Sequence, residues 1–480
     1  MPDINKTSVR EELDRLQTDF RKQSDAGKIS EESRTLIKSL FTLLNLIMSI
    51  FLEKKTTKTN KNSSKPSSQT DKDGTALSSP GSKKKGKIEK NEAACNRRTT
   101  ETVSIAEVNA CTTCGEDLSH QESEALERRT RIDIRFEKII AHVDAEIKSC
   151  GVCQRKTKGT FPADMQGALQ YGNGLKAYAI NLIVCQMVAL NRVQKCLKAM
   201  IGQTVSEASL LKFVWRLHQA LEAWEKAAID ELLKTQAIHV DETSMRVDKK
   251  NHWIHVYSSG DITLKKLHQK RGKKAIEDIN IIPRYGGTII HDCWASYLSY
   301  MHCGHGLCGS HLLRELTFII DSNGYLWAIK IKKLLQEACK KVAKSKRKRL
   351  TKNAYKKLQK QYRTIMTQGK KELPDIPDKP NGRRGKMAKS DAHNLWERLN
   401  TYDEAVLLFA KESHVAFTNN RAEQDLRMSK VKQKVSGCFR TIKYAEAYCR
   451  ISSYLQTMAN KGHNPLIAIQ MALAGEDILP

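Results

Sequence analysis

The sequence is short of acidic residues, and it has neither a long apolar run nor a secretory signal. Its 480 residues include 53 Asp and Glu against 82 Lys and Arg, which gives a formal charge of +29 at pH 7. So large a cationic excess indicates a polyanionic partner, and nucleic acid is the obvious one. Because no apolar run is long enough to span a bilayer and no signal peptide is evident, we expect no membrane contact and a cytoplasmic location.

Disulfides and, in one long segment, apolar residues are also missing. Without a secretory signal, the 13 cysteines indicate reduced thiols or metal ligands. Residues 55–98 are Lys, Ser, Thr, Asn and Gly with almost nothing apolar, so we predict a disordered basic linker there. Such a linker can contact phosphates without reading sequence. Elsewhere the chain can build real cores, because 40% of all its residues are hydrophobic.

Four of the cysteines form two Cys-x-x-Cys pairs, Cys111 with Cys114 and Cys150 with Cys153. Two thiolates three residues apart can bind one ion from a tight turn, and two such pairs complete a tetrahedron around Zn²⁺. The interval between the pairs leaves room for strands and a turn. We therefore predict a structural zinc module over residues 99–166, and the alternative is a set of free thiols.

The N-terminal segment, residues 1–54, has the pattern of a helix. Apolar positions recur at steps of four and three, which is typical of a coiled-coil seam about three repeats long. The seam consists of Ile29, Ser33, Leu36, Leu40, Leu43, Ile47 and Ile50. We predict self-association through these residues, and the alternative is a helix that packs on its own chain.

A second helical region covers residues 167–234. Leu175 to Ile201 is long and mostly apolar, and a helix over 188–202 is followed by a glycine-containing turn. Another helix then begins, with Ser206 near its N-cap. This outline is that of a DNA-binding helix-turn-helix, and ordinary helical-bundle packing is the alternative.

The stretch Ala237-Ile-His-Val-Asp-Glu-Thr alternates apolar and polar residues, as a half-buried strand does. A second strand, Trp253 to Ser259, follows a polar connection over 248–251. The Asp at the end of the first apolar run, Asp241, is held rigidly at a sheet edge, which suits a hard cation such as Mg²⁺. The alternative is an Asp that only caps a turn.

Two more acids strengthen the metal interpretation. Asp292 ends the strand 288–291 after a Gly-Gly turn, and Glu423 begins a helix that Asn419 or Asn420 caps. Three cations follow Glu423 on the same helical face: Arg427, Lys430 and Lys434. A carboxylate beside these cations suits a site for metal and phosphate together, whereas a solvated, ion-paired face would look similar.

Further elements complete a core over residues 235–325 and 414–442. We predict a strand over 263–268, a helix over 272–279, a strand over 305–308 and a helix over 311–321. Cys308 and His311 have ligand-like spacing, but we favour a structural role for them. Residues 326–413 form a helical insertion in which Glu337 is the only acid between 328 and 371. We predict a DNA-backbone surface there, with a solvated charged helix as the alternative.

The motifs together resemble those of bacterial insertion-sequence-66 type transposases. They are His239-Val-Asp-Glu-Thr, Lys270-Arg-Gly through Ile282-Pro-Arg-Tyr-Gly-Gly, His291-Asp-Cys-Trp-Ala-Ser-Tyr, Cys308-Gly-Ser-His-Leu-Leu-Arg-Glu-Leu, Asn419-Asn-Arg-Ala-Glu-Gln-Asp-Leu-Arg, Lys434-Val-Ser-Gly-Cys-Phe-Arg-Thr and Gly462-His-Asn-Pro. The match is ordered and spans nearly the whole chain, so the set is specific although each motif alone is not.

The resemblance implies a ribonuclease-H-like fold with an Asp-Asp-Glu catalytic triad, namely Asp241, Asp292 and Glu423. Two Mg²⁺ or Mn²⁺ ions, roughly 3.5–4 Å apart in such sites, would be bridged by Asp241, with Asp292 and Glu423 each completing one ion. Lys430 would contact DNA phosphate. Glu242 and Asp425 flank the triad, but strand alternation and helical rotation turn them away from it.

The predicted fold is therefore a multidomain α+β and α/β chain. The ribonuclease-H-like core with its helical insertion follows a coiled-coil helix, the zinc module and the helix-turn-helix-like domain, and residues 443–480 close the chain as helices.

The predicted partners are double-stranded DNA at element ends and target, a second copy of the chain, and small accessory proteins from the same element. Two other functions remain: a metal-dependent nuclease or recombinase that cuts without joining, and a catalytically silent DNA-binding regulator.

Overall fold

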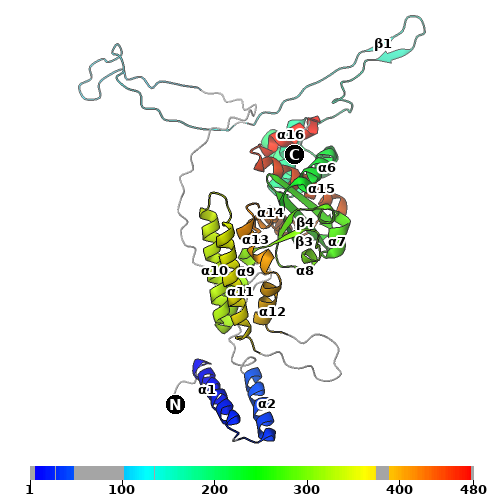
Figure 1. Cartoon of the computed structure of the whole chain (residues 1–480). Helices are drawn as coiled ribbons and strands as arrows, with labels where there is room; N and C mark the ends of the chain where they lie inside the picture. The colour runs from blue at the N-terminus through cyan, green and yellow to red at the C-terminus, as the bar shows by residue number, and fades with distance from the viewer. Residues whose placement is uncertain (1–5, 28, 48–101, 135, 375–388, 477–480) are drawn as a thin grey trace. The chain divides into compact units, whose positions relative to one another are not determined.

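The computed structural model describes residues 6–27, 29–47, 102–134, 136–374 and 389–476 (Figure 1). The predicted linker 55–98 and Ile50 of the predicted seam lie outside these residues. The chain forms two compact units, one from 1–78, 233–241 and 280–424, the other from 79–232, 242–279 and 425–480. Within the described residues, no helix is both long and apolar enough to cross a membrane.

The strands form a mixed five-stranded sheet in the order β5-β4-β3-β6-β7. They are β3 (Ala237–Val247), β4 (Lys250–Ser259), β5 (Ile262–His268), β6 (Thr288–His291) and β7 (Gly304–Leu307). β4 and β5 are antiparallel, whereas β6 is parallel to β3 and β7 is parallel to β6. A mixed sheet with helices confirms the predicted α+β class.

The predicted strands are confirmed with small changes at their ends. The connection after β3 is only two residues, Asp248 and Lys249, with φ values of 47° and 60°. Positive φ at both positions is what a tight hairpin turn requires. β4 therefore begins at Lys250, inside the predicted polar connection, and β7 lies one residue before its predicted place.

In the first unit, the strands and the inserted helices share one apolar core. α9 (Gly309–Asn323), α10 (Leu326–Lys344), α11 (Lys352–Lys370), α12 (Asp391–Thr401) and α13 (Asp403–Lys411) supply most of it. Ile290 and Leu307 of the sheet belong to the same buried cluster as Trp327. α10 and α11 run side by side (Figure 1), and a Cβ on Gly369 of α11 would come within 2.6 Å of the Trp327 side chain. The predicted insertion is thus helical, and it continues the core of the sheet.

The N-terminal segment is a helical hairpin, where one helix was predicted. α1 (Lys6–Asp25) ends before Gly27, whose φ is +69°, and α2 (Glu31–Ile47) runs back beside it (Figure 1). Phe20 and Phe41 join the two helices with ring centroids 5.7 Å apart. The predicted seam is wrong at its start, because Ile29 lies in the bend and not in a helix.

The second unit contains the predicted helical region. α3 (Asn173–Ile180) continues as a π-helical turn, η3 (Asn181–Cys185), and the chain then breaks at Met187, whose φ is 58°. The mostly apolar stretch 175–201 is therefore divided between two helices. α4 (Leu190–Ile201) ends at Gly202 with φ +65°, and α5 (Glu207–Ala220) begins after Ser206, whose side chain accepts a hydrogen bond from the Ser209 N–H. The predicted helix, glycine turn and Ser206 N-cap are confirmed, and α6 (Glu222–Lys234) follows.

The closing helices of the second unit, α15 (Ile442–Asn460) and α16 (Pro465–Ala474), agree with the predicted helical end. α15 covers the edge strand β5, whose backbone N–H groups would otherwise stay open to another chain. Lys265 N–H donates to Ser453 Oγ at 2.7 Å, and Thr263 N–H donates to Thr457 Oγ1 at 3.1 Å. Side-chain hydroxyls thus complete this edge of the sheet.

Candidate active site

Asp241 lies in β3, and Asp292 directly follows the neighbouring parallel strand β6. In the register of β3 and β6, Ala237 is opposite Thr288 and His239 is opposite Ile290. Asp241 and Asp292 each lie two residues beyond this last pair, and Asp292 directly follows the last residue of β6. Adjacent strands are about 4.8 Å apart. The register therefore puts both acids just beyond the same end of the paired segment.

Glu423 reaches the same region through Asn419. Asn419 precedes α14 (Asn420–Ser436), and its carbonyl oxygen accepts from the Glu423 N–H at 3.3 Å. Its side chain is buried, with Nδ2 donating to the Val240 carbonyl at 2.8 Å and Oδ1 lying 2.9 Å from Nδ1 of His239. Asn419 thus ties the first turn of α14 to the residue immediately before Asp241.

The junction of β7 and α9 holds the same residue from the other side. The Asn419 N–H donates to Cys308 Sγ at 3.1 Å, and the Gly309 N–H donates to the Phe417 carbonyl at 2.7 Å. A Cβ on Gly309 would come within 2.3 Å of the Phe417 ring, so glycine is needed for this close approach. Cys308 therefore contacts the residue that precedes α14.

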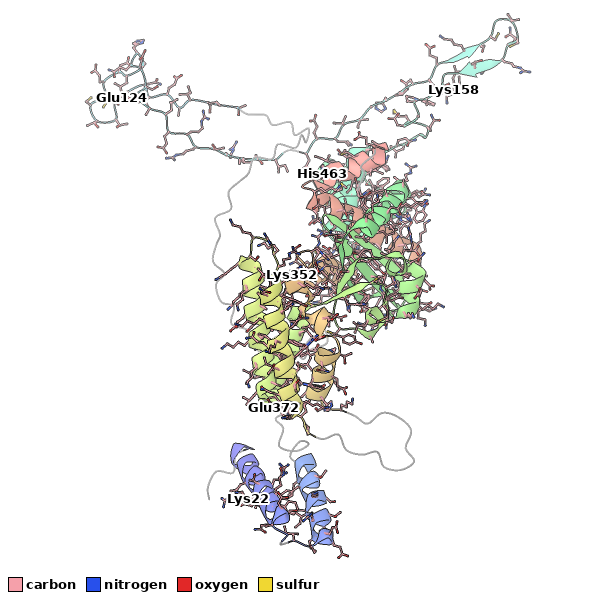
Figure 2. The ribbon with its side chains drawn as sticks, viewed as in Figure 1. Lys22, Glu124, Lys158, Lys352, Glu372 and His463 are labelled. Atoms are coloured by element: carbon pink, nitrogen blue, oxygen red, sulfur yellow. The ribbon has the colours of Figure 1, made fainter. Side chains whose placement is uncertain are left out.

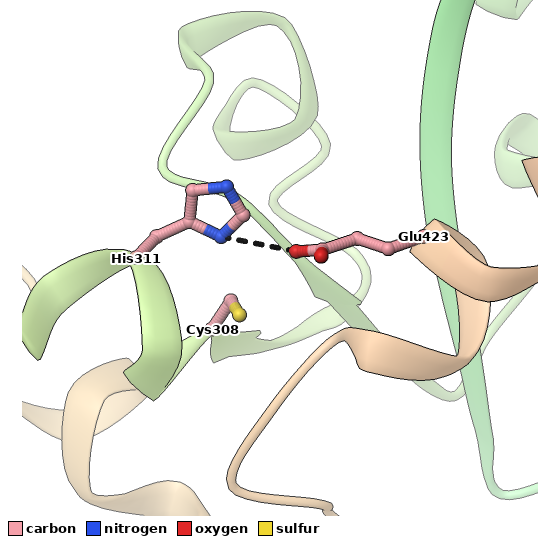
Figure 3. Close-up of side chains that lie close together, drawn as sticks. All are labelled: Cys308, His311 and Glu423. Carbon is pink, nitrogen blue, oxygen red and sulfur yellow. Dashed lines mark ion pairs between the residues drawn. The ribbon is translucent and has the colours of Figure 1, made fainter. Parts of the chain in front are cut away.

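Cys308 and His311 also face Glu423 (Figure 3). The sulfur, a ring nitrogen and a carboxylate oxygen lie within 4.8 Å of one another, and Nδ1 of His311 is 3.6 Å from Oε1 of Glu423. Burial, followed by the charges of Arg314 and Arg398, lowers the pKa of His311 to about 4. The imidazole is consequently neutral at neutral pH, and the contact is polar but not an ion pair. Within the described residues, this group of mutually close ligand atoms does not include Asp241 or Asp292.

Arg398 is a residue of this region that sequence reasoning missed. It comes from α12, inside the insertion, and pairs with Glu315 on α9, one helical turn after His311. Burial acts to lower the pKa of Arg398. The nearby carboxylates of Glu315 and Asp292 act in the opposite direction, and the pKa is raised on balance. Only the Lys and Arg content of the insertion hinted at such a residue, and that content does not single out Arg398.

The two flanking acids have partners elsewhere, in agreement with the predicted alternation. Glu242 is buried and pairs with Arg271 at 2.6 Å, and the Arg271 guanidinium lies over the Trp253 ring. Asp425 is buried and accepts from Ser258 Oγ at 2.6 Å and from Thr263 Oγ1 at 2.9 Å. Both carboxylates therefore serve packing within the second unit.

Asp425→Ala is expected to lower the free energy of unfolding by about 3 kcal/mol, because two buried hydroxyls lose their acceptor and a buried cation loses a counter-charge. That cation is Lys265, whose pKa is lowered by burial while Asp425 acts in the opposite direction. Chemical denaturation measures the change. Gln424→Ala, at an exposed neighbouring position, is the control, and equal stability of the two variants would show that Asp425 is not a core residue.

The cations predicted on α14 are accessible. Arg427, Lys430 and Lys434 are all exposed. A further basic surface lies on α11, the helix that Lys352 and Glu372 bracket in Figure 2. A hollow on this helix is lined by Lys356, Lys360 and Arg363 together with neutral polar residues. These surfaces offer charge that suits a phosphate backbone.

The two Cys-x-x-Cys pairs form turns with matching hydrogen bonds. The Cys111 N–H donates to the Glu116 carbonyl and the Gly115 N–H to the Cys111 carbonyl, and Cys150 repeats this pattern with Arg155 and Gln154. An isolated bridge, Ala110 with Asp117, closes the first turn, and the strands β1 (Ile147–Ser149) and β2 (Lys156–Lys158) close the second.

In each turn, backbone N–H groups point at the first sulfur. Those of Cys114 and Thr113 lower the pKa of Cys111 to about 7, and those of Cys153 and Val152 lower the pKa of Cys150. Donors that stabilise a thiolate are what a metal-binding cysteine turn provides. Each turn on its own therefore suits a metal ligand pair.

Comparison with known proteins gives one family. The model described as Transposase IS66 family matches residues 168–447, more than half of the chain. The search of curated proteins gives no match to the chain.

Proposed function

Because the chain belongs to the IS66 family of transposases, we propose that it binds the terminal inverted repeats of an insertion sequence and catalyses metal-dependent DNA cleavage and strand transfer. A transposase cuts and moves DNA, so DNA is the partner that the cationic surfaces and the +29 charge suit. The proposed catalytic groups are Asp241, Asp292 and Glu423. The observation that supports the proposal is the strand register, which pairs β3 with β6 just ahead of Asp241 and Asp292.

The donor chemistry of these residues fits Mg²⁺ or Mn²⁺. Three carboxylates offer the hard oxygen ligands that such cations prefer. Oε1 of Glu423 is buried and makes no hydrogen bond within the described part of the chain, so it retains lone pairs for a cation. Two bound ions would polarise the phosphodiester and stabilise the leaving oxygen.

The chain's own residues would do the positioning. Asp241 lies in β3, Asp292 directly follows β6, and the start of the helix that carries Glu423 is attached to β3 through Asn419. Arg427, Lys430 and Lys434 lie on the exposed face of α14, where they would bind phosphate and fix the DNA relative to Glu423. The basic face of α11 would hold more of the DNA backbone.

The remaining parts of the proposal follow the predicted domain map. The strand order β5-β4-β3-β6-β7 supports a ribonuclease-H-like core over 235–325 and 414–442, interrupted by the 326–413 insertion. α4, its glycine turn and α5 support a helix-turn-helix that would read the element ends.

In α2, Leu36 and Leu40 are 67% and 53% exposed, which supports self-association through this helix. Accessory proteins from the same element stay a proposal.

The two cysteine turns support a structural zinc site made of Cys111, Cys114, Cys150 and Cys153. Replacing Cys150 by Ser is expected to lower the zinc content by about one ion per chain, because three thiolates hold Zn²⁺ much less tightly than four. Elemental analysis of the purified full-length protein measures it. Cys438→Ser, at an exposed cysteine outside the turns, is the control, and a Cys150→Ser protein with full zinc content would contradict the site.

Two other functions give different results in one assay. A strand-transfer reaction with Mg²⁺ and terminal-repeat fragments should yield joined products from a transposase. A metal-dependent nuclease or recombinase that cuts without joining would yield nicked ends only. A catalytically silent regulator would bind the fragment and leave it intact. Joined products that depend on Asp241 support the proposal, and binding without any cleavage overturns it.

A further inference from the structure

Glu423 is shared between two sets of side chains. It is the third carboxylate of the proposed triad, and it also lies within 4.8 Å of the Cys308 sulfur and a His311 ring nitrogen (Figure 3). Cys308 directly follows β7 at the N-cap of α9, His311 is in the first turn of α9, and Glu423 is in the first turn of α14. A thiol, an imidazole and a carboxylate that converge in this way are a mixed S, N, O donor set.

That donor set selects a different cation from three carboxylates. Sulfur and imidazole ligands favour Zn²⁺ and related metals over Mg²⁺, which prefers oxygen alone. Zn²⁺ commonly takes three protein ligands in a tetrahedral site and leaves the fourth position to water. We propose that Cys308, His311 and Glu423 form a second zinc site, and that a zinc ion bound there removes Glu423 from the proposed Mg²⁺ site and inhibits strand transfer. The inhibition rests on the proposed function, whereas the zinc site itself does not.

The geometry is close to what such a site requires. From the usual Zn–N, Zn–O and Zn–S distances, ligand atoms around a tetrahedral Zn²⁺ are about 3.4–3.6 Å apart. Nδ1 of His311 is already 3.6 Å from Oε1 of Glu423, and that oxygen is buried without a hydrogen bond in the described part of the chain. The His311–Glu423 pair is thus at the separation that a tetrahedral site needs, and the Cys308 sulfur lies within 4.8 Å of both.

The Cys308 side chain is held in place by its surroundings. Cys308 is fully buried, and its sulfur is already oriented by the Asn419 N–H at 3.1 Å. Zinc binding would release the Sγ proton to solvent as the Zn–S bond forms.

The number of zinc ions bound by the full-length protein tests the site. Cys308→Ser should bind about one Zn²⁺ per chain fewer than wild type, while its hydroxyl can still accept from the Asn419 N–H. Cys303→Ser removes another buried thiol, one that donates to the Tyr285 carbonyl, and should bind as many ions as wild type. Because the comparison is a difference, zinc in the cysteine turns does not affect it.

Glu423→Gln gives a second variant at a less buried position, in case Cys308→Ser does not fold. It should lose the same equivalent of zinc, since an amide is a poor ligand. Equal zinc content in wild type, Cys308→Ser and Glu423→Gln would overturn the site. Co²⁺ in place of Zn²⁺ should give a thiolate-to-metal absorption contribution that Cys308→Ser lacks.

Inhibition is measured separately, in strand-transfer reactions with Mg²⁺ in fixed excess and increasing Zn²⁺. The residual activity of Cys308→Ser should need at least about tenfold more zinc for half-inhibition, because even lost outer-sphere contacts weaken metal binding tenfold or more. Identical inhibition of both proteins would overturn the regulatory part. A wild-type protein without strand transfer in Mg²⁺ would count against the proposed function and leave the zinc difference intact.

Discussion

Replacing Asp241 by Asn is expected to reduce both cleavage and strand transfer by about a thousandfold or more. The substitution keeps the size and shape of the side chain but removes the charge that would hold two cations, and metal stabilisation of the transition state contributes several kcal/mol. DNA binding should stay near the wild-type level, because phosphate contacts elsewhere supply most of the affinity. Single-turnover cleavage and joining of a labelled terminal fragment measure the loss.

The three acids are expected to act as one unit in the same assay. Asp292→Asn and Glu423→Gln should each cause a loss of similar size. Groups that share one metal centre are strongly non-additive, so Asp241→Asn combined with Glu423→Gln should be little worse than either alone. Losses that multiply in the double variant would mean that the two carboxylates act independently and not on a common centre.

Asn419→Leu is expected to reduce catalysis by about a hundredfold with little change in DNA binding. The change removes the amide that donates to Val240 and faces His239, so the start of α14 loses its attachment to β3. A displacement of Glu423 by about 1 Å is enough for a loss of this size. Cleavage rate and binding, measured on one fragment, separate misplacement of the carboxylate from loss of the fold.

Two variants control the Asn419 experiment. Asn420→Ala alters the next residue, which is exposed, and should keep the wild-type rate. Asn419→Asp keeps the size but replaces the donor amide by an acceptor that repels the Val240 carbonyl, so it should be as defective as Asn419→Leu. Full activity of Asn419→Leu would show that α14 is positioned by other contacts.

Local sequence patterns predicted the strands and the acids at their ends. The alternation in Ala237 to Thr243 predicted β3, and the Gly-Gly turn before Thr288 predicted β6 with its observed bounds. β7 was displaced by one residue because Gly304 and Gly306 carry no strand pattern. These elements were predictable because strand periodicity and turn residues act over only a few positions.

Contacts between distant parts of the chain were not predictable in the same way. Asn419 could be identified as a helix cap, but its bonds to His239 and Val240 join residues about 180 positions apart. The Cys308 and His311 spacing was visible, whereas their approach to Glu423 depends on how α9 and α14 pack. The break at Met187 was missed because an apolar run gives no local sign of a left-handed residue.

The most direct test of the account compares Asp241→Asn with Glu242→Gln on one terminal-repeat fragment at fixed salt and Mg²⁺. The two acids are neighbours, but Glu242 is buried against Arg271 and a glutamine can still accept from that guanidinium. The account predicts that Asp241→Asn binds the fragment but fails to join strands, while Glu242→Gln binds and joins at near the wild-type rate. Near-normal joining by Asp241→Asn together with failure of Glu242→Gln would show that the metal ligand has been misassigned.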